Sequence, residues 1–303
     1  MADAGMRQSS SAPEELVREV LHAFRARHPE AGAPKLFFAP GRVNLMGAHL
    51  DYSGGAVLPA AIDRGTLIAV APRSDGKVLF SSSLQAGEHL FELDGIPQAA
   101  TGSWVDYPLG VLREFLSSAA ERPGGASIHF GGNLPIGAGL SSSASICVGT
   151  ALALDKVWGL GLQEIDHVHA ALSAEREFVG VQCGIMDPYA VGLARAGSLL
   201  WLECGEVRYE HLPLDTSRVS ILVADTMVRR ELATSAFNQR VDECRRAFEL
   251  LKQSQPEARC LAEVSMETLS ACGEELGPVL SRRAGHVIAE VARTEVARAG
   301  LLA

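Results

Sequence analysis

The pattern of apolar and polar positions predicts a chain of mixed helices and strands. Helical spacing predicts helices over 14–27, 141–158 and 163–179, and from residue 233 onward. Short apolar runs between Gly, Pro and polar residues predict strands over 35–39, 56–59, 66–71, 78–83, 127–131, 198–203 and 219–225. Together these elements indicate an α+β protein without internal repeats.

The length of 303 residues favours two domains. The small and polar residues at the start predict a disordered tail over 1–12. A junction is expected near 187–197, which divides the rest of the chain into an N-terminal domain, 13–190, and a C-terminal domain, 191–303.

Composition narrows the classes of function. The formal net charge is -9 and no block of like charges occurs, which argues against a nucleic-acid or anionic-membrane partner. The six cysteines form no CxxC pair, so we expect free thiols in a reducing compartment. No stretch approaches the ~20 apolar residues of a transmembrane helix, and no apolar signal segment opens the sequence. A soluble, cytoplasmic protein is expected, whose oligomeric state the sequence does not predict.

A glycine-rich loop, NLPIGAGLSSSA over 133–144, carries the strongest local signal. Gly137 and Gly139 allow a tight turn and a close approach of the backbone to a ligand. The serines that follow begin a helix, whose free N–H groups and positive dipole attract phosphate. The loop lacks the lysine of a Walker A motif, and Ser142 stands where a dinucleotide fingerprint needs glycine. An ordinary N-capped helix after a flexible turn is the alternative interpretation.

Two carboxylates downstream also need an explanation. Glu175 falls within an apolar helical stripe, and burying a carboxylate is costly unless it is paired or binds a metal. A Mg²⁺ ligand is one interpretation, because Mg²⁺ takes one or two protein carboxylates together with substrate phosphates. A glutamate at the edge of the stripe that reaches solvent is the other. Asp187, followed by Pro188, is typical of a helix N-cap, although a capping aspartate can still face a pocket.

A loop rich in polar residues and glycine over 40–55 gathers Arg42, His49 and Asp51. The arginine could neutralise charge on a transferred phosphoryl group, and the other two could hydrogen-bond sugar hydroxyls. The alternative is an Asx turn at Asp51 with a solvated arginine and histidine.

Five stretches, taken together, resemble the galactokinase family of the GHMP kinase superfamily. GRVNLMGAHLDY over 41–52 is similar to the family's N-terminal motif, and LPIGAGLSSSAS over 134–145 to the superfamily's phosphate loop. AEREFVGVQCGIMD over 174–187, TMVRRELATSAFNQR over 226–240 and SWVDY over 103–107 follow the family pattern in the same order.

The resemblance implies a two-domain GHMP kinase fold, with a ribosomal-protein-S5-like N-terminal domain and a ferredoxin-like C-terminal domain. ATP and a small-molecule sugar would bind between them. Asp187 would be the base or orienting group, and Arg42 would stabilise the transferred phosphoryl. The ATP phosphates would be held by Gly137, Ala138, Gly139, Leu140, Ser141, Ser142 and Ser143. Ser142 and Glu175 would bind Mg²⁺. Trp104 would form a wall of the adenine pocket. The sugar would contact His49, Asp51, Gly184 and Phe237.

Several positions depart from the family pattern. Ala48 stands where the family usually has a sugar-binding glutamate, and Phe237 stands where a tyrosine is common. Leu50 replaces a threonine, and Pro188 replaces a glutamine. A missing hydrogen bond to a buried sugar hydroxyl costs ~1–3 kcal/mol, so altered sugar specificity is expected. The family's C-terminal GAGFGG stretch is absent. The C-terminal domain is therefore expected to be incomplete, with reduced stability and low activity.

The expected function is that of a sugar 1-kinase, which uses ATP to convert D-galactose to galactose 1-phosphate. A galactokinase-like sugar- or ATP-binding protein without activity and a kinase for a related sugar remain alternatives. A dinucleotide-dependent oxidoreductase is a third class, which Ser142 argues against.

Overall fold

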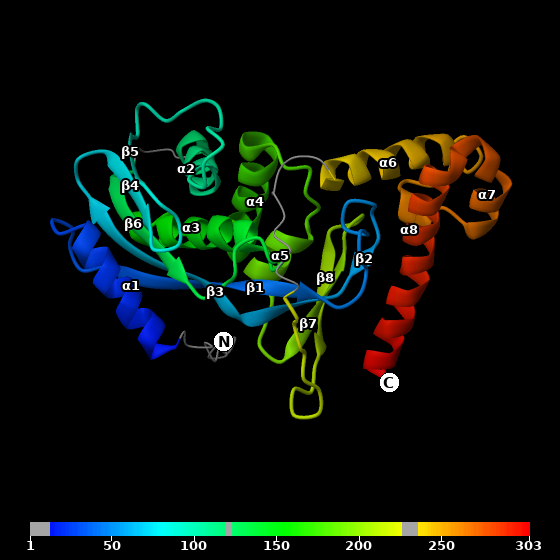
Figure 1. Ribbon diagram of the computed structural model, residues 1–303, viewed down its shortest axis with the longest axis horizontal. Coiled ribbons are helices and arrows are strands. Elements are labelled where there is room, and N and C mark those ends of the chain that lie inside the picture. The colour runs from blue at the N-terminus through cyan, green and yellow to red at the C-terminus, as the bar shows by residue number, and fades with distance from the viewer. Residues whose placement is uncertain (1–12, 119–122, 226–235) are drawn as a thin grey trace.

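The computed structural model describes residues 13–118, 123–225 and 236–303. The tail expected over 1–12 lies outside this part of the chain. Two β-sheets organise the protein, and the helices cover them (Figure 1). The mixture of helices and sheets confirms the predicted α+β class.

The larger sheet has the strand order β1-β3-β6-β4-β5, and all of its neighbours are antiparallel except β4 and β6. Its strands are β1 (Lys35–Asn44), β3 (Pro59–Arg73), β4 (Lys77–Ser82), β5 (Glu88–Glu92) and β6 (Gly125–Gly132). The interior strand β3 is buried on both faces over 65–71, which explains its continuous apolar run.

The two faces of β3 pack against different helices. Leu67, Ala69 and Ala71 pack against Val20 and Phe24 of α1 (Glu14–Arg27). The alternate residues face the main core, which is covered by α2 (Asp106–Ser118), α3 (Ser142–Trp158) and α4 (Glu164–Ser173). Figure 1 shows α1 on one side of the sheet and these helices on the other.

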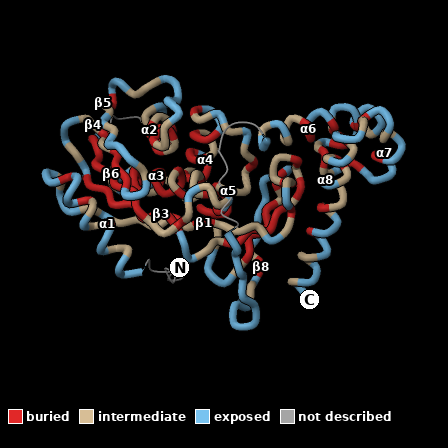
Figure 2. Tube along the Cα trace, viewed as in Figure 1, coloured by how far each residue is buried: buried red, intermediate tan, exposed pale blue. Residues whose placement is uncertain are grey.

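The smaller sheet has the order β2-β7-β8, formed by β2 (Ala56–Val57), β7 (Ser198–Glu203) and β8 (Arg208–Pro213). Beside it lie α6 (Ala236–Leu251), the 3₁₀ turn η2 (Leu261–Glu263), α7 (Met266–Ala271) and α8 (Gly273–Leu302). The long helix α8 is kinked at Gly277, which has φ 68° and precedes Pro278. Figure 2 shows buried residues concentrated in the two sheets, whereas much of the outer surface of α7 and α8 is exposed.

One predicted strand is absent from the structure. The apolar run 219–225 is not a strand, and Leu222 is 92% exposed. A strand needs a neighbour for its backbone N–H and C=O groups, and within the described residues no strand pairs with this run. The helix expected over 163–179 is confirmed, as α4 continued by a π-helical turn, Ala174–Val179. The elements β5, β8 and α2 were not predicted.

The start of the helical region expected from residue 233 falls partly outside the described residues, and α6 begins at Ala236. β2, although early in the chain, shares a sheet with β7 and β8, so the expected domain boundary near residue 190 stays a prediction. Within the described residues, no helix combines the length and the apolar character that crossing a membrane requires.

Candidate active site

Asp187 lies at the centre of the candidate site. It is in the first turn of α5 (Met186–Leu193), and the N-cap of that helix is Ile185. The Asp187 carboxylate accepts hydrogen bonds from Nε and Nη2 of Arg42, each at 2.7 Å. Its Oδ2 also accepts a bond of 2.5 Å from the Ser141 hydroxyl. The capping role considered for Asp187 is therefore wrong, because its carboxylate faces β1 and the glycine-rich loop.

The glycine-rich loop meets this carboxylate at the beginning of α3. Gly137, Gly139 and Ser141 all have positive φ, at 73°, 76° and 61°. The left-handed conformation of a serine is strained, and Ser141 uses its side chain to bond Asp187 instead of capping α3. Arg42 also donates from Nη1 to the carbonyl of Gly139 at 2.7 Å. The N-terminal end of α3, the loop and Asp187 thus converge on one point.

A cavity of about 570 Å³ adjoins this loop. The loop contributes Gly137, Ala138, Gly139 and Leu140 to its lining, opposite Asp63 and Arg64. Backbone N–H groups at the start of a helix, beside a glycine-rich turn, form a suitable site for phosphate oxygens.

Glu175 is held in the π-helical turn close to α3. The extra residue of this turn is visible at Gly180, whose N–H donates to the Glu175 carbonyl. The Glu175 side chain is buried, and burial, with a smaller contribution from Asp187, raises its pKa to about 7. One carboxylate oxygen bonds the Ser143 hydroxyl, whereas Oε2 is buried without a hydrogen-bond partner.

This arrangement fits a Mg²⁺ ligand. A buried carboxylate oxygen without a partner is costly, and a cation would satisfy it. The hydroxyl beside Glu175 belongs to Ser143, and the assignment of Ser142 to the metal stays a prediction. Within the described residues, no group of three or more His, Cys, Asp or Glu side chains could hold a metal. Mg²⁺ does not need such a group, because substrate phosphates and water complete its coordination.

Asp51 and Gly184 extend the site away from the loop. Withdrawal from water, and secondly the nearby Asp187 carboxylate, raise the pKa of Asp51 to about 7. A Cβ on Gly184 would lie 1.9 Å from Asp51 Oδ2, so only glycine leaves room for this carboxylate. The two residues predicted to contact the sugar therefore touch each other.

His49 continues the same surface. Its Nδ1 bonds the Tyr52 hydroxyl at 2.8 Å, and its Nε2 accepts from Arg240 Nη1 at 3.3 Å. Tyr52 makes an edge-to-face contact with Phe237, with ring centroids 5.6 Å apart. The structure therefore brings together His49, Asp51, Gly184 and Phe237 as one group.

Helix α8 holds this loop from the far end of the sequence. Glu290 Oε1 accepts the backbone N–H groups of Gly47, at 2.9 Å, and Ala48, at 3.1 Å. His286 Nε2 donates to the Ala48 carbonyl at 2.9 Å. The sequence predictions missed both residues. Their contacts span 238 to 243 positions, and no local motif signals them.

Trp104 lies apart from the residues described so far. Its ring contacts His89 and Phe130, and its Nε1 donates to the Ala86 carbonyl at 3.2 Å. Its assignment to an adenine pocket stays a prediction.

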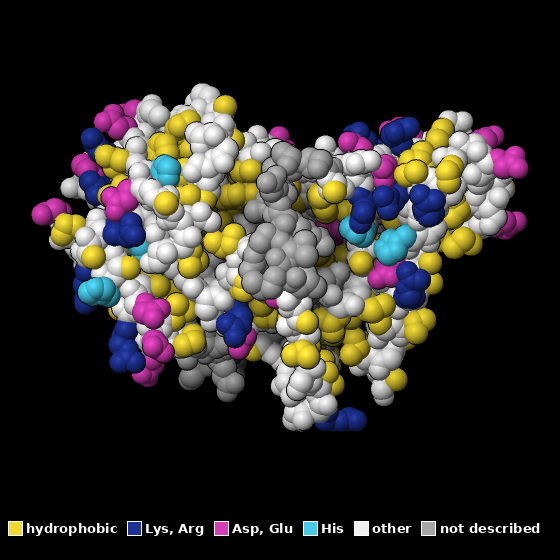
Figure 3. All heavy atoms as spheres, in the orientation of Figure 1, with side chains coloured by type: hydrophobic (Ala, Val, Ile, Leu, Met, Phe, Trp, Pro, Cys, Tyr) yellow, Lys and Arg dark blue, Asp and Glu magenta, His cyan; other side chains and the backbone are white. Residues whose placement is uncertain are grey.

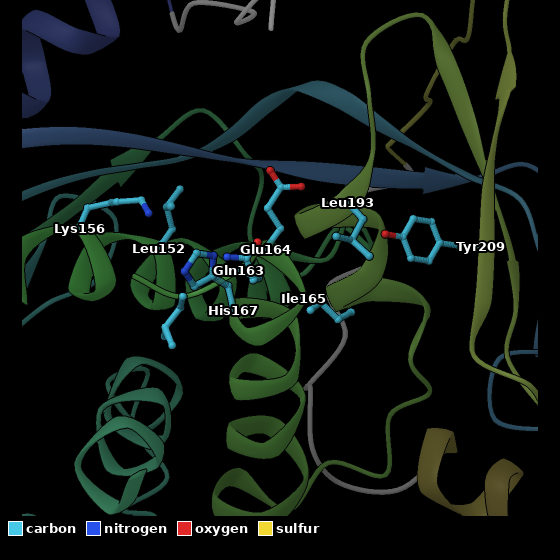
Figure 4. A pocket seen from close by; sticks show the side chains of 9 residues that line it. Leu152, Lys156, Gln163, Glu164, Ile165, His167, Leu193 and Tyr209 are labelled. Carbon is cyan, nitrogen blue, oxygen red and sulfur yellow. The ribbon is translucent and has the colours of Figure 1, made fainter. Parts of the chain in front are cut away.

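A second cavity, of about 600 Å³, lies between α3, α4, α5 and β8 (Figure 4). Lys156, His167 and Tyr209 are among its lining residues, and none of the predicted site residues is. The buried carboxylate of Asp155 bonds His167 at 3.0 Å and Lys156 at 2.8 Å. The charged groups at this cavity are thus already paired.

Comparison with known proteins agrees with this geometry. The model of the GHMP kinases N terminal domain matches residues 106–195, and that of the galactokinase galactose-binding signature matches residues 22–72. The chain is 34% identical to a galactokinase of Fusobacterium nucleatum over 285 residues, which cover 93% of this chain and 73% of that protein. This chain belongs to the galactokinase family. A galactokinase of Exiguobacterium sibiricum is 40% identical over 264 residues, which cover 85% of this chain and 66% of the relative.

Solved structures extend the comparison to the fold. A galactokinase of Lactococcus lactis complexed with galactose superposes with a TM-score of 0.85 at 29% identity, and the match covers 94% of this chain and 74% of that one. Mevalonate kinase of Methanococcus jannaschii shares the fold, with a TM-score of 0.55 at 16% identity. The predicted GHMP kinase fold and the resemblance to galactokinases are confirmed.

Proposed function

We propose that this galactokinase-family chain transfers the γ-phosphoryl group of ATP to the anomeric hydroxyl of D-galactose. One observation carries the proposal. The Asp187 carboxylate is fixed by Arg42 and Ser141 at the point where the glycine-rich loop enters α3. A carboxylate beside a phosphate-binding loop is where an acceptor hydroxyl must lie for phosphoryl transfer.

The reaction needs positioning and charge neutralisation. The galactose O1 attacks the γ-phosphorus, its bond to phosphorus forms, and the bond to the β–γ bridging oxygen breaks to release ADP. Asp187 orients the hydroxyl and accepts its proton, while Arg42 neutralises charge on the transferred group. Phosphates would bind over residues 137–143, at the positive end of α3.

Glu175 and a neighbouring serine hydroxyl are the residues that would hold Mg²⁺. The ion would supply positive charge to the β- and γ-phosphates. Until it binds, the Glu175 carboxylate is unfavourably buried, as its raised pKa reflects.

Sugar contacts would come from Asp51 and His49, beside Gly184 and Phe237. Asp51 offers two acceptor oxygens close to Asp187, so the sugar would lie between the two carboxylates. A cytoplasmic location belongs to the same proposal, because the reaction consumes ATP and six unpaired thiols suit a reducing compartment.

Release of ADP in the presence of galactose, measured with a coupled assay, tests this function. Asp187→Asn keeps the size of the side chain but removes the proton acceptor, and it should lower kcat by about 10²–10⁴-fold. ADP release that is independent of sugar, or unchanged in this variant, would contradict the proposal. An inactive sugar-binding protein would bind galactose without any release.

A further inference from the structure

Among the described residues at the sugar end of the site, Arg240 is a positively charged side chain that forms no ion pair. Arg240 is partly buried on α6 and donates to His49 Nε2. Its Nε is buried without a hydrogen-bond partner, and within the described residues no carboxylate lies within ion-pair distance of its guanidinium. A partly buried arginine without a counter-charge is unfavourable unless a ligand supplies one.

The nearby acids form ion pairs with other residues, and Glu243 interacts with Arg240 more weakly than with Arg283. Glu243, on the same helix, pairs with Arg283 at 2.6 Å. Glu290 pairs with Arg293 at 2.7 Å and accepts the two N–H groups of the loop. Lys, Arg and His side chains gather over α6 and the adjoining part of α8 in Figure 3.

The two histidines near Arg240, His49 and His286, supply hydrogen-bonding groups but no negative charge. Because Arg240 donates to His49 Nε2, the proton of His49 lies on Nδ1, toward Tyr52. His286 donates to the Ala48 carbonyl, and its ring lies 5.9 Å from that of His49. His286 therefore bonds the backbone of Ala48, next to His49, and Arg240 bonds His49.

Ala48 is an uncharged residue at the sugar end of the site, so the net charge there depends on which residue occupies this position. Its side chain is exposed, and the resemblance to galactokinases implies a glutamate at this position. A glutamate here would add a negative charge next to His49, the residue that Arg240 bonds. Alanine supplies no charge at this exposed position, in a loop whose backbone α8 holds in place.

We propose that the preferred acceptor of this chain is a hexuronic acid, whose carboxylate takes the place of the missing glutamate carboxylate. The inference rests on the proposed sugar kinase function and specifies its substrate class. A carboxylate matches one arginine in charge and fits the guanidinium as a bidentate acceptor. A phosphate is larger and carries up to two charges, for which the structure offers a single unpaired arginine.

Direct binding measures the preference without relying on turnover. Isothermal titration of the full chain with D-galacturonic acid, D-galactose and galactose 6-phosphate should give the tightest binding for galacturonic acid, by about tenfold or more over galactose. Added salt should weaken galacturonic acid binding and leave galactose binding unchanged.

Ala48→Glu and Ala48→Gln form a matched pair of variants. They differ in charge but hardly in size, so Ala48→Glu should reverse the preference toward galactose, whereas Ala48→Gln should lower the affinity for both sugars. Equal or tighter binding of galactose by the unaltered chain overturns the inference. So does tightest binding of galactose 6-phosphate, or an equal shift of the ratio by both variants.

Failure of this inference can be distinguished from failure of the proposed function. If galactose supports ADP release and galacturonic acid neither binds nor reacts, the kinase function stands and the acidic substrate is excluded. If no sugar raises ADP release above that of Asp187→Asn, the kinase function fails, and the titrations still decide which sugar the site binds.

Discussion

Replacement of Glu290 should reveal how far α8 controls the sugar loop. Glu290→Ala removes the acceptor of two backbone N–H groups, one at the buried Gly47 and one at the more accessible Ala48. An unsatisfied buried donor costs ~1–3 kcal/mol, and the accessible one can turn to water. We therefore expect the free energy of unfolding to fall by about 2–3 kcal/mol, which lowers Tm by roughly 4–6 °C.

The matched variants separate the causes of this loss. Glu290→Gln keeps an oxygen that can accept both N–H groups, so it should cost less than about 1 kcal/mol. Arg293→Ala removes only the ion pair, and because the Arg293 side chain is 51% exposed, we expect at most about 1 kcal/mol. Thermal and urea unfolding give these values.

Kinetics then test whether the loop is the part affected. The loop carries His49 and Asp51, so Glu290→Ala should raise KM for the sugar several-fold more than KM for ATP. If Glu290→Gln is as damaging as Glu290→Ala, the backbone bonds are not the reason for the loss. An equal rise in both KM values would refute the link to the sugar loop.

Three further predictions follow from the described contacts. The pKa of Glu175 is raised to about 7, so the folded state binds the proton of this carboxyl group more tightly than the unfolded state does. The ligand-free protein should therefore lose stability as pH rises from about 4.5 to 7. Glu175→Gln should weaken this decline, which Tm measured from pH 5 to 8 checks. Gly184→Ala should displace Asp51 and raise the sugar KM at least tenfold with little change in the ATP KM, because its Cβ would lie 1.9 Å from the carboxylate; an unchanged sugar KM would contradict this geometry. Burial lowers the pKa of His129 to about 4, so stability should be lost as pH falls from 6.5 toward 4, and His129→Gln should flatten that part of a urea-unfolding pH profile.

Local sequence was sufficient to predict functional residues where a single short segment carries the groups that bind or react. The glycine-rich loop and Arg42 were predicted from neighbouring residues, and the role of Asp187 from the family resemblance; the structure brings all three together. Spacing alone could not show that Asp187 bonds Ser141 instead of capping its helix, because that contact joins segments 46 residues apart.

The pattern of apolar residues did not predict the local structure or the role of a residue where these depend on contacts with distant parts of the chain. The run 219–225 is apolar like a buried strand but pairs with no strand in the described part of the chain. The π-helical turn at Glu175 adds one residue to a turn that the helical pattern treats as regular. The sequence analysis assigned no role to Glu290 or Arg240, and only their distant partners reveal one.

The hydrogen bonds between α8 and the backbone of Gly47 and Ala48 also have a consequence for biosynthesis. Residues 47–48 leave the ribosome early, whereas Glu290 is synthesised 242 positions after Ala48. Contacts between such distant residues form late in folding, because the entropy of closing the intervening loop must first be overcome. A nascent chain that already contains the glycine-rich loop and Asp187 therefore lacks a fixed sugar loop, and the sugar site matures only when α8 docks.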